Sequence, residues 1–164
     1  MDKIVKHGVV IADPVENMTS LIAAMVRGLG HRMVLEITNP RELKAVLDSR
    51  SYSLIILDDM MGPPDAVELV RQMRTDIESP NRTTAVIMMS AAPDIARIAE
   101  ARDAGVSEFL KKPFSATDLQ KRIAGLDIKP REFIDAPDYA GPDRRRRKLA
   151  TGIEDQRTIS ETET

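Results

Sequence analysis

The sequence predicts a doubly wound α/β domain built on a five-stranded parallel sheet, followed by a flexible C-terminal tail. The first observation is a set of short apolar runs, rich in Val, Ile and Leu and without strict alternation, as in strands covered on both faces. They span residues 8–13, 33–37, 53–58, 84–90 and 107–111. The second is that segments of helical period separate these runs. Such alternation favours right-handed crossovers, with helices on both faces of the sheet.

Each helical segment carries a start or stop signal of its own. The first has an apolar stripe from Val15 to Leu29, and Gly30 is expected to end it. The other four are expected to begin at residues that favour the N-cap: Asn39, Asp65, Asp94 and Ser115. The fourth of the five is expected to end at Gly105. These signals place a helix after every predicted strand.

Composition limits the classes of protein and of site that need to be considered. The 164 residues suffice for one domain and a tail, which we place at residues 1–125 and 126–164. The net charge of −2 excludes a globally basic nucleic-acid binder, and the absence of Cys excludes disulfides, thiolate zinc sites and Cys nucleophiles. No apolar run approaches the roughly 18 residues of a membrane span. We therefore expect a cytoplasmic protein without membrane insertion.

Charged and polar residues stand at the ends of four predicted strands, where parallel strands bring their functional groups together. They are Asp13, Asp58, Ser90 and Lys112. Two carboxylates beside an ammonium and a hydroxyl suit a hard cation and a phosphoryl group. Asp58 can itself act as a nucleophile and form an acyl phosphate. Each residue taken alone is an ordinary cap or loop residue, but their joint placement favours a site.

The ordered motifs along residues 8–124 resemble those of a response-regulator receiver domain of the CheY type, which has a flavodoxin-like fold. In chain order they are IILDDMM around Asp58, DAVEL from Asp65, MMSA around Ser90, DAG ending at Gly105, and FLKKPF around Lys112. The resemblance implies a signalling protein that is not an enzyme and that receives a phosphoryl group from a histidine kinase. It also implies a cis peptide bond before Pro113.

The resemblance further implies the role of each site residue. Asp58 is the implied phosphoacceptor, and Asp13, Asp58 and the backbone carbonyl of Met60 are the implied Mg²⁺ ligands. The remaining implied roles are the partner of the phosphoryl group, Lys112, and the switch pair that reports phosphorylation, Ser90 with Phe109.

Three positions depart from the receiver pattern. Pro14 stands where receivers have a second acidic residue, Gly62 replaces a usual Pro, and Ala66 replaces a usual Gly. Asp59 is expected to point to the opposite side of the strand end, so it does not replace the missing carboxylate. We therefore expect Mg²⁺ to bind more weakly than in ordinary receivers, because Mg²⁺ depends on few carboxylates.

The tail contains a compact basic block. Residues 141–148 carry five positive charges against Asp143 alone, behind the segment APDYAGPD. The stretch 130–147 resembles the arginine-rich extension of the Cle group, CheY-like proteins that bind cyclic di-GMP and act at the flagellar motor. That resemblance implies cyclic di-GMP as a ligand, held by Tyr139, Gly141, Pro142, Asp143, Arg144, Arg145, Arg146 and Arg147. The Cle extension can include a second Gly-Pro-basic segment, and residues 149–164 of this chain contain none.

The residue types in this block also suit a guanine nucleotide. Tyr139 can stack on the base, Asp143 can accept from its Watson–Crick edge, and an arginine can pair with guanine O6 and N7 or with phosphate. Such a charge run has an alternative interpretation, which is a solvated tail whose basic and acidic parts attract each other.

Three hypotheses follow for the whole chain. The first is a single-domain signalling adaptor whose tail binds cyclic di-GMP and which docks on a partner such as a flagellar motor switch protein. The second is a phosphorelay carrier that accepts phosphate on Asp58, and Pro14 argues against it because a carrier needs fast Mg²⁺-dependent chemistry. The third is a nucleic-acid-binding regulator that uses the arginine run. A block this short gives salt-sensitive, non-specific binding, so no specific nucleic acid is expected.

Overall fold

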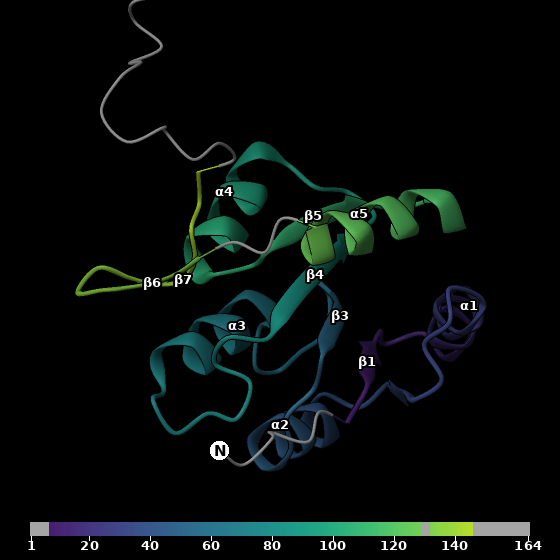
Figure 1. Cartoon of the computed structure of the whole chain (residues 1–164), viewed down its shortest axis with the longest axis horizontal. Coiled ribbons are helices and arrows are strands. Elements are labelled where there is room, and N and C mark those ends of the chain that lie inside the picture. The colour runs from purple at the N-terminus through teal and green to yellow at the C-terminus, as the bar shows by residue number, and fades with distance from the viewer. Residues whose placement is uncertain (1–6, 129–131, 146–164) are drawn as a thin grey trace, which may run out of the picture.

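A computed structural model of the chain describes residues 7–128 and 132–145 and contains the predicted five-stranded parallel sheet (Figure 1). The strand order is β2-β1-β3-β4-β5, so the chain reverses direction across the sheet after β2. The strands are β1 (Val9–Ala12), β2 (Val34–Ile37), β3 (Leu54–Asp58), β4 (Ala85–Ser90) and β5 (Glu108–Lys111). The predicted fold class is therefore confirmed.

The predicted helices follow the strands, and their caps are formed by the expected residues. The helices are α1 (Glu16–Gly28), α2 (Pro40–Ser49), α3 (Ala66–Thr75), α4 (Ile95–Ala104) and α5 (Ala116–Ile128). The side chains of Asn39, Asp65 and Asp94 accept hydrogen bonds from amides in the first turns of α2, α3 and α4. At the start of α5, Ser115 and Asp118 bond each other's backbone amides reciprocally. No helix in the described part of the chain is long and apolar enough to cross a membrane.

The helices cover the sheet on both faces and create two apolar cores. Buried residues of α2, α3 and α4 pack on one face, together with alternate strand residues such as Val10 and Ile55. Buried residues of α1 and α5 pack on the other face, with Val9 and Ile56. Because both faces of every central strand are buried, the strand sequences are continuously apolar instead of alternating.

The structure corrects the boundary that we placed at residue 126. Helix α5 continues to Ile128, and the chain then forms an antiparallel hairpin of β6 (Phe133–Ala136) and β7 (Tyr139–Pro142), joined at residues 137–138. The expectation of a flexible tail therefore fails for 126–128 and 132–145. For residues 146–164 it lies outside the described residues. The hairpin strands, FIDA and YAGP, contain no continuous apolar run of the kind that predicts the strands of the sheet, and packing on the receiver accounts for this hairpin.

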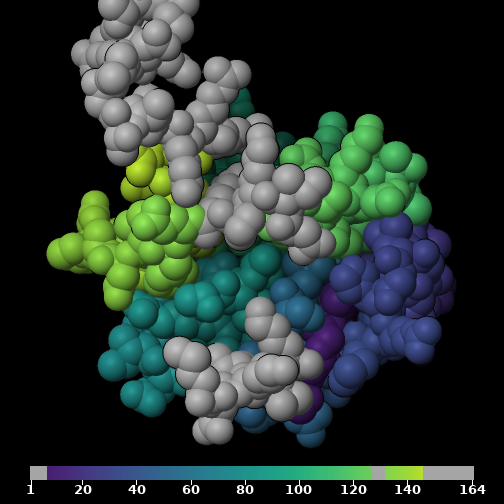
Figure 2. Space-filling view, in the orientation of Figure 1, coloured from purple at the N-terminus to yellow at the C-terminus, as the bar shows by residue number. Residues whose placement is uncertain are grey.

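Strand β7 lies against α3 and α4, and in the space-filling view the yellow-green hairpin rests directly on the teal part of the chain (Figure 2). The contact is close because two glycines meet there: a Cβ on Gly141 would lie 2.9 Å from the Cα of Gly105. Gly105 has a φ of 109°, as expected of the residue that ends α4. Tyr139, at the start of β7, is only 7% exposed. The hairpin is thus an integral part of the folded domain.

Candidate phosphoacceptor site

The carboxyl ends of β1, β3 and β5 bring Asp13, Asp58 and Lys112 into direct contact. The Nζ atom of Lys112 lies 2.5 Å from Oδ2 of Asp13 and 2.7 Å from Oδ2 of Asp58. Both aspartates are buried, with exposures of 1% and 4%. The three residues are separated by up to 99 positions in the sequence, so only the parallel sheet unites them. The peptide bond between Lys112 and Pro113 is cis.

Backbone amides hold the second oxygen of each carboxylate. The Val15 amide donates to Oδ1 of Asp13 at 2.8 Å, and the Met60 amide donates to Oδ1 of Asp58 at 2.9 Å. Burial alone would lower the pKa of Lys112, but the hydrogen bonds to the two aspartates outweigh burial and raise that pKa. Lys112 is therefore a firmly protonated ammonium between two oriented carboxylates.

The oxygen donors at the strand ends fit a magnesium ion only in part. Asp13 and Asp58 each place a carboxylate there, and Met60 follows Asp58 on an exposed loop. Pro14, also exposed, brings no side-chain oxygen. Among the described residues, no three His, Cys, Asp or Glu side chains form a group that could hold a metal ion. Mg²⁺ nevertheless binds proteins through one or two carboxylates and several waters. The oxygen atoms present here are therefore ligands of the kind that Mg²⁺ takes.

Ser90 and Phe109 lie beside the site on β4 and β5. Ser90 ends β4, is 2% exposed, and its carbonyl accepts a hydrogen bond from the Lys112 amide at 2.8 Å. Phe109 pairs with Met88 in the sheet and packs, partly buried, against the core on the α4 side. Ser90 therefore shares a backbone hydrogen bond with Lys112, and Phe109 lies between the sheet and α4.

Arg97 is a residue that sequence reasoning missed. It lies in the first turn of α4 and bonds Asp65 at 2.9 Å, Glu100 at 3.1 Å and the backbone carbonyl of Asp59 at 3.2 Å. Burial would raise the pKa of Asp65, but the hydrogen bonds from Arg97 and from α3 amides lower it. The Asp59 carboxylate also lies toward Arg97, at 3.9 Å from Nε. Arg97 thus links the loop that follows Asp58 to α4, and nothing in its local sequence indicates this.

The described part of the predicted nucleotide site is largely engaged in contacts within the protein. The Arg144 guanidinium lies 4.4 Å from the centre of the Tyr139 ring and forms a 3.0 Å ion pair with Asp103 of α4. Asp143 pairs with Arg145 at 2.8 Å. Gly141 and Pro142 are buried within β7, and Arg146 and Arg147 lie outside the described residues.

This arrangement differs from the expectation that Tyr139 is open for stacking on a base. Its ring is buried between the hairpin and the receiver, and its hydroxyl donates to the Pro142 carbonyl. The Asp143 carboxylate is also occupied by its neighbour Arg145. Among the described members of the predicted site, the accessible ones are Arg144 and Arg145, whose side chains are 43% and 61% exposed.

Residues 9–124 match the response regulator receiver domain family. The chain belongs to this family. A probable transcriptional regulator, ycf27, from Cyanidium caldarium is 26% identical over 121 residues, which are 74% of this chain but only 46% of that protein. The chain thus spans less than half the length of this relative. A chemotaxis protein CheY from Pseudomonas aeruginosa is 27% identical over 115 residues, 70% of this chain and 91% of that one.

Solved structures agree on the fold of this receiver. A putative response regulator from Chloroflexus aurantiacus superposes with a TM-score of 0.67 at 21% identity, over 76% of this chain and all of that one. The chemotaxis protein CheY4 of Vibrio cholerae gives a TM-score of 0.64 at 20% identity, over 73% of this chain and 98% of that one. In each comparison the match covers about three quarters of this chain, which leaves the arginine block to be interpreted from its own residues.

Proposed function

We propose that this receiver acts as a signalling adaptor that accepts a phosphoryl group on Asp58 from a histidine kinase in the cytoplasm. The observation that carries the proposal is the ammonium of Lys112, held between the buried carboxylates of Asp13 and Asp58. An oxygen of Asp58 attacks the phosphorus of phosphohistidine, the bond from phosphorus to the imidazole nitrogen breaks, and an acyl phosphate forms. The phosphorylated group belongs to the protein itself, so this is a switch and not an enzyme.

The residues around Asp58 have distinct tasks in this reaction. Lys112 is placed to pair with the oxygens of the transferred phosphoryl group, and the Met60 amide fixes the orientation of the attacking carboxylate. Asp13, Asp58 and the Met60 carbonyl would hold Mg²⁺. When bound, this ion neutralises charge on the phosphoryl oxygens. With Pro14 in place of a further acid, we propose weak Mg²⁺ binding.

Binding of beryllofluoride, which mimics the phosphoryl group, tests this proposal by NMR. With Mg²⁺ present, we expect saturable shifts of the Ser90, Phe109 and Lys112 amides, because Ser90 and Phe109 are the proposed switch pair. The Asp58→Asn variant should show none of these shifts. Shifts that persist in Asp58→Asn would contradict the assignment of the acceptor.

We further propose that the arginine block binds cyclic di-GMP and that the ligand promotes docking on a protein partner such as a flagellar motor switch component. The resemblance of residues 130–147 to the Cle extension supports this, and so does the exposure of Arg144 and Arg145. Both side chains are held by carboxylates of the same chain, Asp103 and Asp143. The ligand phosphates would have to replace these carboxylates, and Tyr139 would become available for stacking only if Arg144 leaves its ring.

Calorimetry with two cyclic dinucleotides of equal charge tests this second part. Cyclic di-GMP should bind more tightly than cyclic di-AMP, because only guanine offers the O6 acceptor to arginine. Arg145→Ala should weaken binding roughly tenfold or more, whereas Arg41→Ala, on the exposed face of α2, should not. Equal affinities for the two dinucleotides would mean that the block is a general polyanion-binding patch.

A further inference from the structure

Arg74, in the last turn of α3, is a buried cation that plays no part in the phosphoacceptor site. It is 1% exposed. Its Nε donates to the Gly105 carbonyl at 3.1 Å, and its Nη1 donates to the carbonyls of Arg82 at 2.7 Å and Asn81 at 3.5 Å. Among the side chains that the structure describes, those of residues 7–126 and 132–145, no carboxylate pairs with it, and Nη2 takes part in none of these bonds. Buried charges are normally paired, so this guanidinium is suited to an anionic partner.

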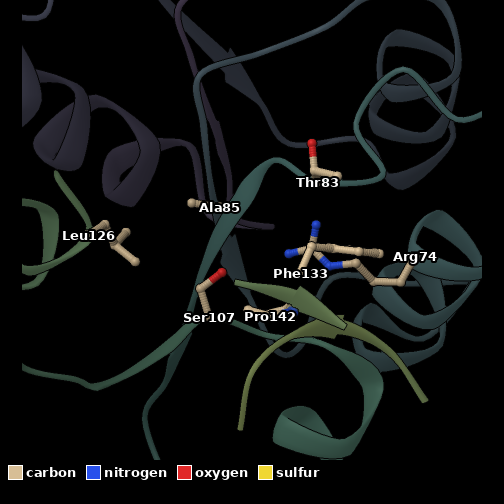
Figure 3. A pocket seen from close by; sticks show the side chains of 7 residues that line it. All are labelled: Arg74, Thr83, Ala85, Ser107, Leu126, Phe133 and Pro142. Atoms are coloured by element: carbon tan, nitrogen blue, oxygen red, sulfur yellow. The ribbon is translucent and has the colours of Figure 1, made fainter. Parts of the chain in front are cut away.

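A pocket of about 160 Å³ opens beside this guanidinium (Figure 3). Its walls include the hydroxyl-bearing residues Thr83 and Ser107, and Ala85 at the start of β4. Phe133 and Pro142, which face each other in the hairpin, close it on another side. The pocket therefore lies at the amino ends of β4 and β5, at the opposite end of the strands from Asp58. It is formed jointly by the receiver and the hairpin.

The polar groups of the pocket are arranged to donate hydrogen bonds. A guanidinium has donors only. The Ser107 hydroxyl accepts a hydrogen bond from the Val86 amide at 3.0 Å, which leaves its own proton for a second acceptor. Burial lowers the pKa of Arg74 to about 10, partly offset by Tyr139, so the side chain is charged at neutral pH. A ligand that accepts hydrogen bonds and carries negative charge meets these requirements.

The volume restricts the size of that ligand. Pockets for drug-sized molecules and cofactors begin at about 300 Å³, whereas this one has room for roughly five water molecules at about 30 Å³ each. A tetrahedral oxyanion matches this volume better than a whole nucleotide does. We propose that the pocket binds a phosphate group, as inorganic phosphate or as a phosphomonoester, between Arg74 and Ser107. Because Phe133 and Pro142 form part of the wall, binding also stabilises the docked hairpin.

Titration of the full chain with inorganic phosphate, followed by NMR, tests the proposal. We expect saturable shifts of the Arg74 Nε–Hε signal and of the Ser107 amide, which chloride at the same ionic strength does not produce. A parallel titration with phenyl phosphate identifies the source of the group. Tighter binding of the ester would show that Phe133 and its apolar neighbours accept an organic substituent, and tighter binding of inorganic phosphate would show that the site takes the free ion. No saturable shift with either compound would overturn the proposal.

Arg74→Gln would remove a buried cation that three backbone carbonyls depend on, and loss of binding could then reflect unfolding of the protein. A variant that fills the pocket avoids this ambiguity. Ala85→Leu occupies the pocket while it leaves Arg74 and Ser107 in place, and it should weaken phosphate binding roughly tenfold or more. Ala45→Leu, on the exposed surface of α2, makes the same change outside the pocket and should bind phosphate like the wild type. Both variants should keep the beryllofluoride response of Asp58 and the affinity for cyclic di-GMP, so failure here is distinct from failure of the proposed function. Wild-type phosphate affinity in Ala85→Leu would overturn the proposal.

Discussion

At the scale of single residues, Lys112 balances the charge at the strand ends. It neutralises one of two buried carboxylates that approach it to 2.5 and 2.7 Å. Its pKa is raised above the ordinary value of 10.5, because the bonds to Asp13 and Asp58 outweigh its burial. A pKa that rises on folding contributes stability below the unfolded value, and this contribution disappears as the pH rises through the folded value.

We therefore predict that Lys112→Met lowers the free energy of unfolding by roughly 1–3 kcal/mol at neutral pH, because it leaves two buried carboxylate oxygens without their hydrogen-bond donor. Urea denaturation measures this. The difference from the wild type should stay constant up to about pH 10 and shrink only above it. Lys44→Met, which removes the exposed Lys44–Asp48 pair on α2, should cost less than about 0.5 kcal/mol. A difference that disappears near neutral pH would contradict this role of Lys112.

Pro14 is the second residue with a defined consequence. It follows Asp13, a proposed Mg²⁺ ligand, and its side chain provides no oxygen. Pro14→Asp adds a carboxylate beside Asp13, so we predict tighter Mg²⁺ binding, measured by calorimetry. Pro14→Ala, which removes the ring without adding charge, should leave the affinity unchanged. If Pro14→Asp does not bind Mg²⁺ more tightly, the position does not face the ion.

At the scale of elements, the β6–β7 hairpin depends on backbone contact and not on a large apolar face. Gly141 leaves no room for a side chain, because a Cβ on it would lie 2.9 Å from the Cα of Gly105. The Arg82 guanidinium lies over the Phe133 ring, 5.2 Å from its centre, and pairs with Asp135 at 3.0 Å. These contacts place the first arginines of the basic block at the C-terminal end of α4. The hairpin is therefore the element that fixes where the block begins.

We predict that Gly141→Ala displaces the hairpin. A Cβ there would lie 2.7 Å from the Tyr139 hydroxyl and 2.9 Å from the Cα of Gly105. The second contact is with backbone, and a movement of the Tyr139 hydroxyl would break its hydrogen bond to the Pro142 carbonyl. Hydrogen exchange should show loss of protection for the amides of β6 and β7. Gly125→Ala, in α5, meets nothing within 4 Å and should stabilise the protein by up to about 1 kcal/mol. Unchanged protection in Gly141→Ala would show that the docking is loose.

At the scale of the whole molecule, the sheet separates two polar regions. The residues of the proposed phosphoacceptor site lie at the carboxyl ends of the strands, and the hairpin with Arg74 lies at the amino ends of β4 and β5. Helix α4 contacts both: Arg97 joins its first turn to the loop after Asp58, and Asp103 in its last turn pairs with Arg144. A movement of α4 on phosphorylation would therefore also change the surroundings of the arginine block.

The sequence was sufficient for the sheet, the helices and the strand-end residues, because apolar runs and N-caps such as Asn39 and Asp65 are local signals. It was insufficient for the hairpin, since its strands FIDA and YAGP contain no continuous apolar run and depend on Gly105, which lies far away in the chain. Arg74 illustrates the same limit. A basic residue in the last turn of a helix normally indicates solvent exposure and a favourable helix dipole, and its burial arises from three carbonyls in other segments.

The most direct test of the account is the site of covalent phosphorylation. The full chain is incubated with acetyl phosphate and Mg²⁺, and intact-mass spectrometry is applied to the wild type, Asp58→Asn and Asp59→Asn. We predict a single phosphoryl adduct on the wild type and on Asp59→Asn, because Asp59 lies toward Arg97, and none on Asp58→Asn. An adduct that persists in Asp58→Asn, or that disappears only in Asp59→Asn, would contradict the central claim.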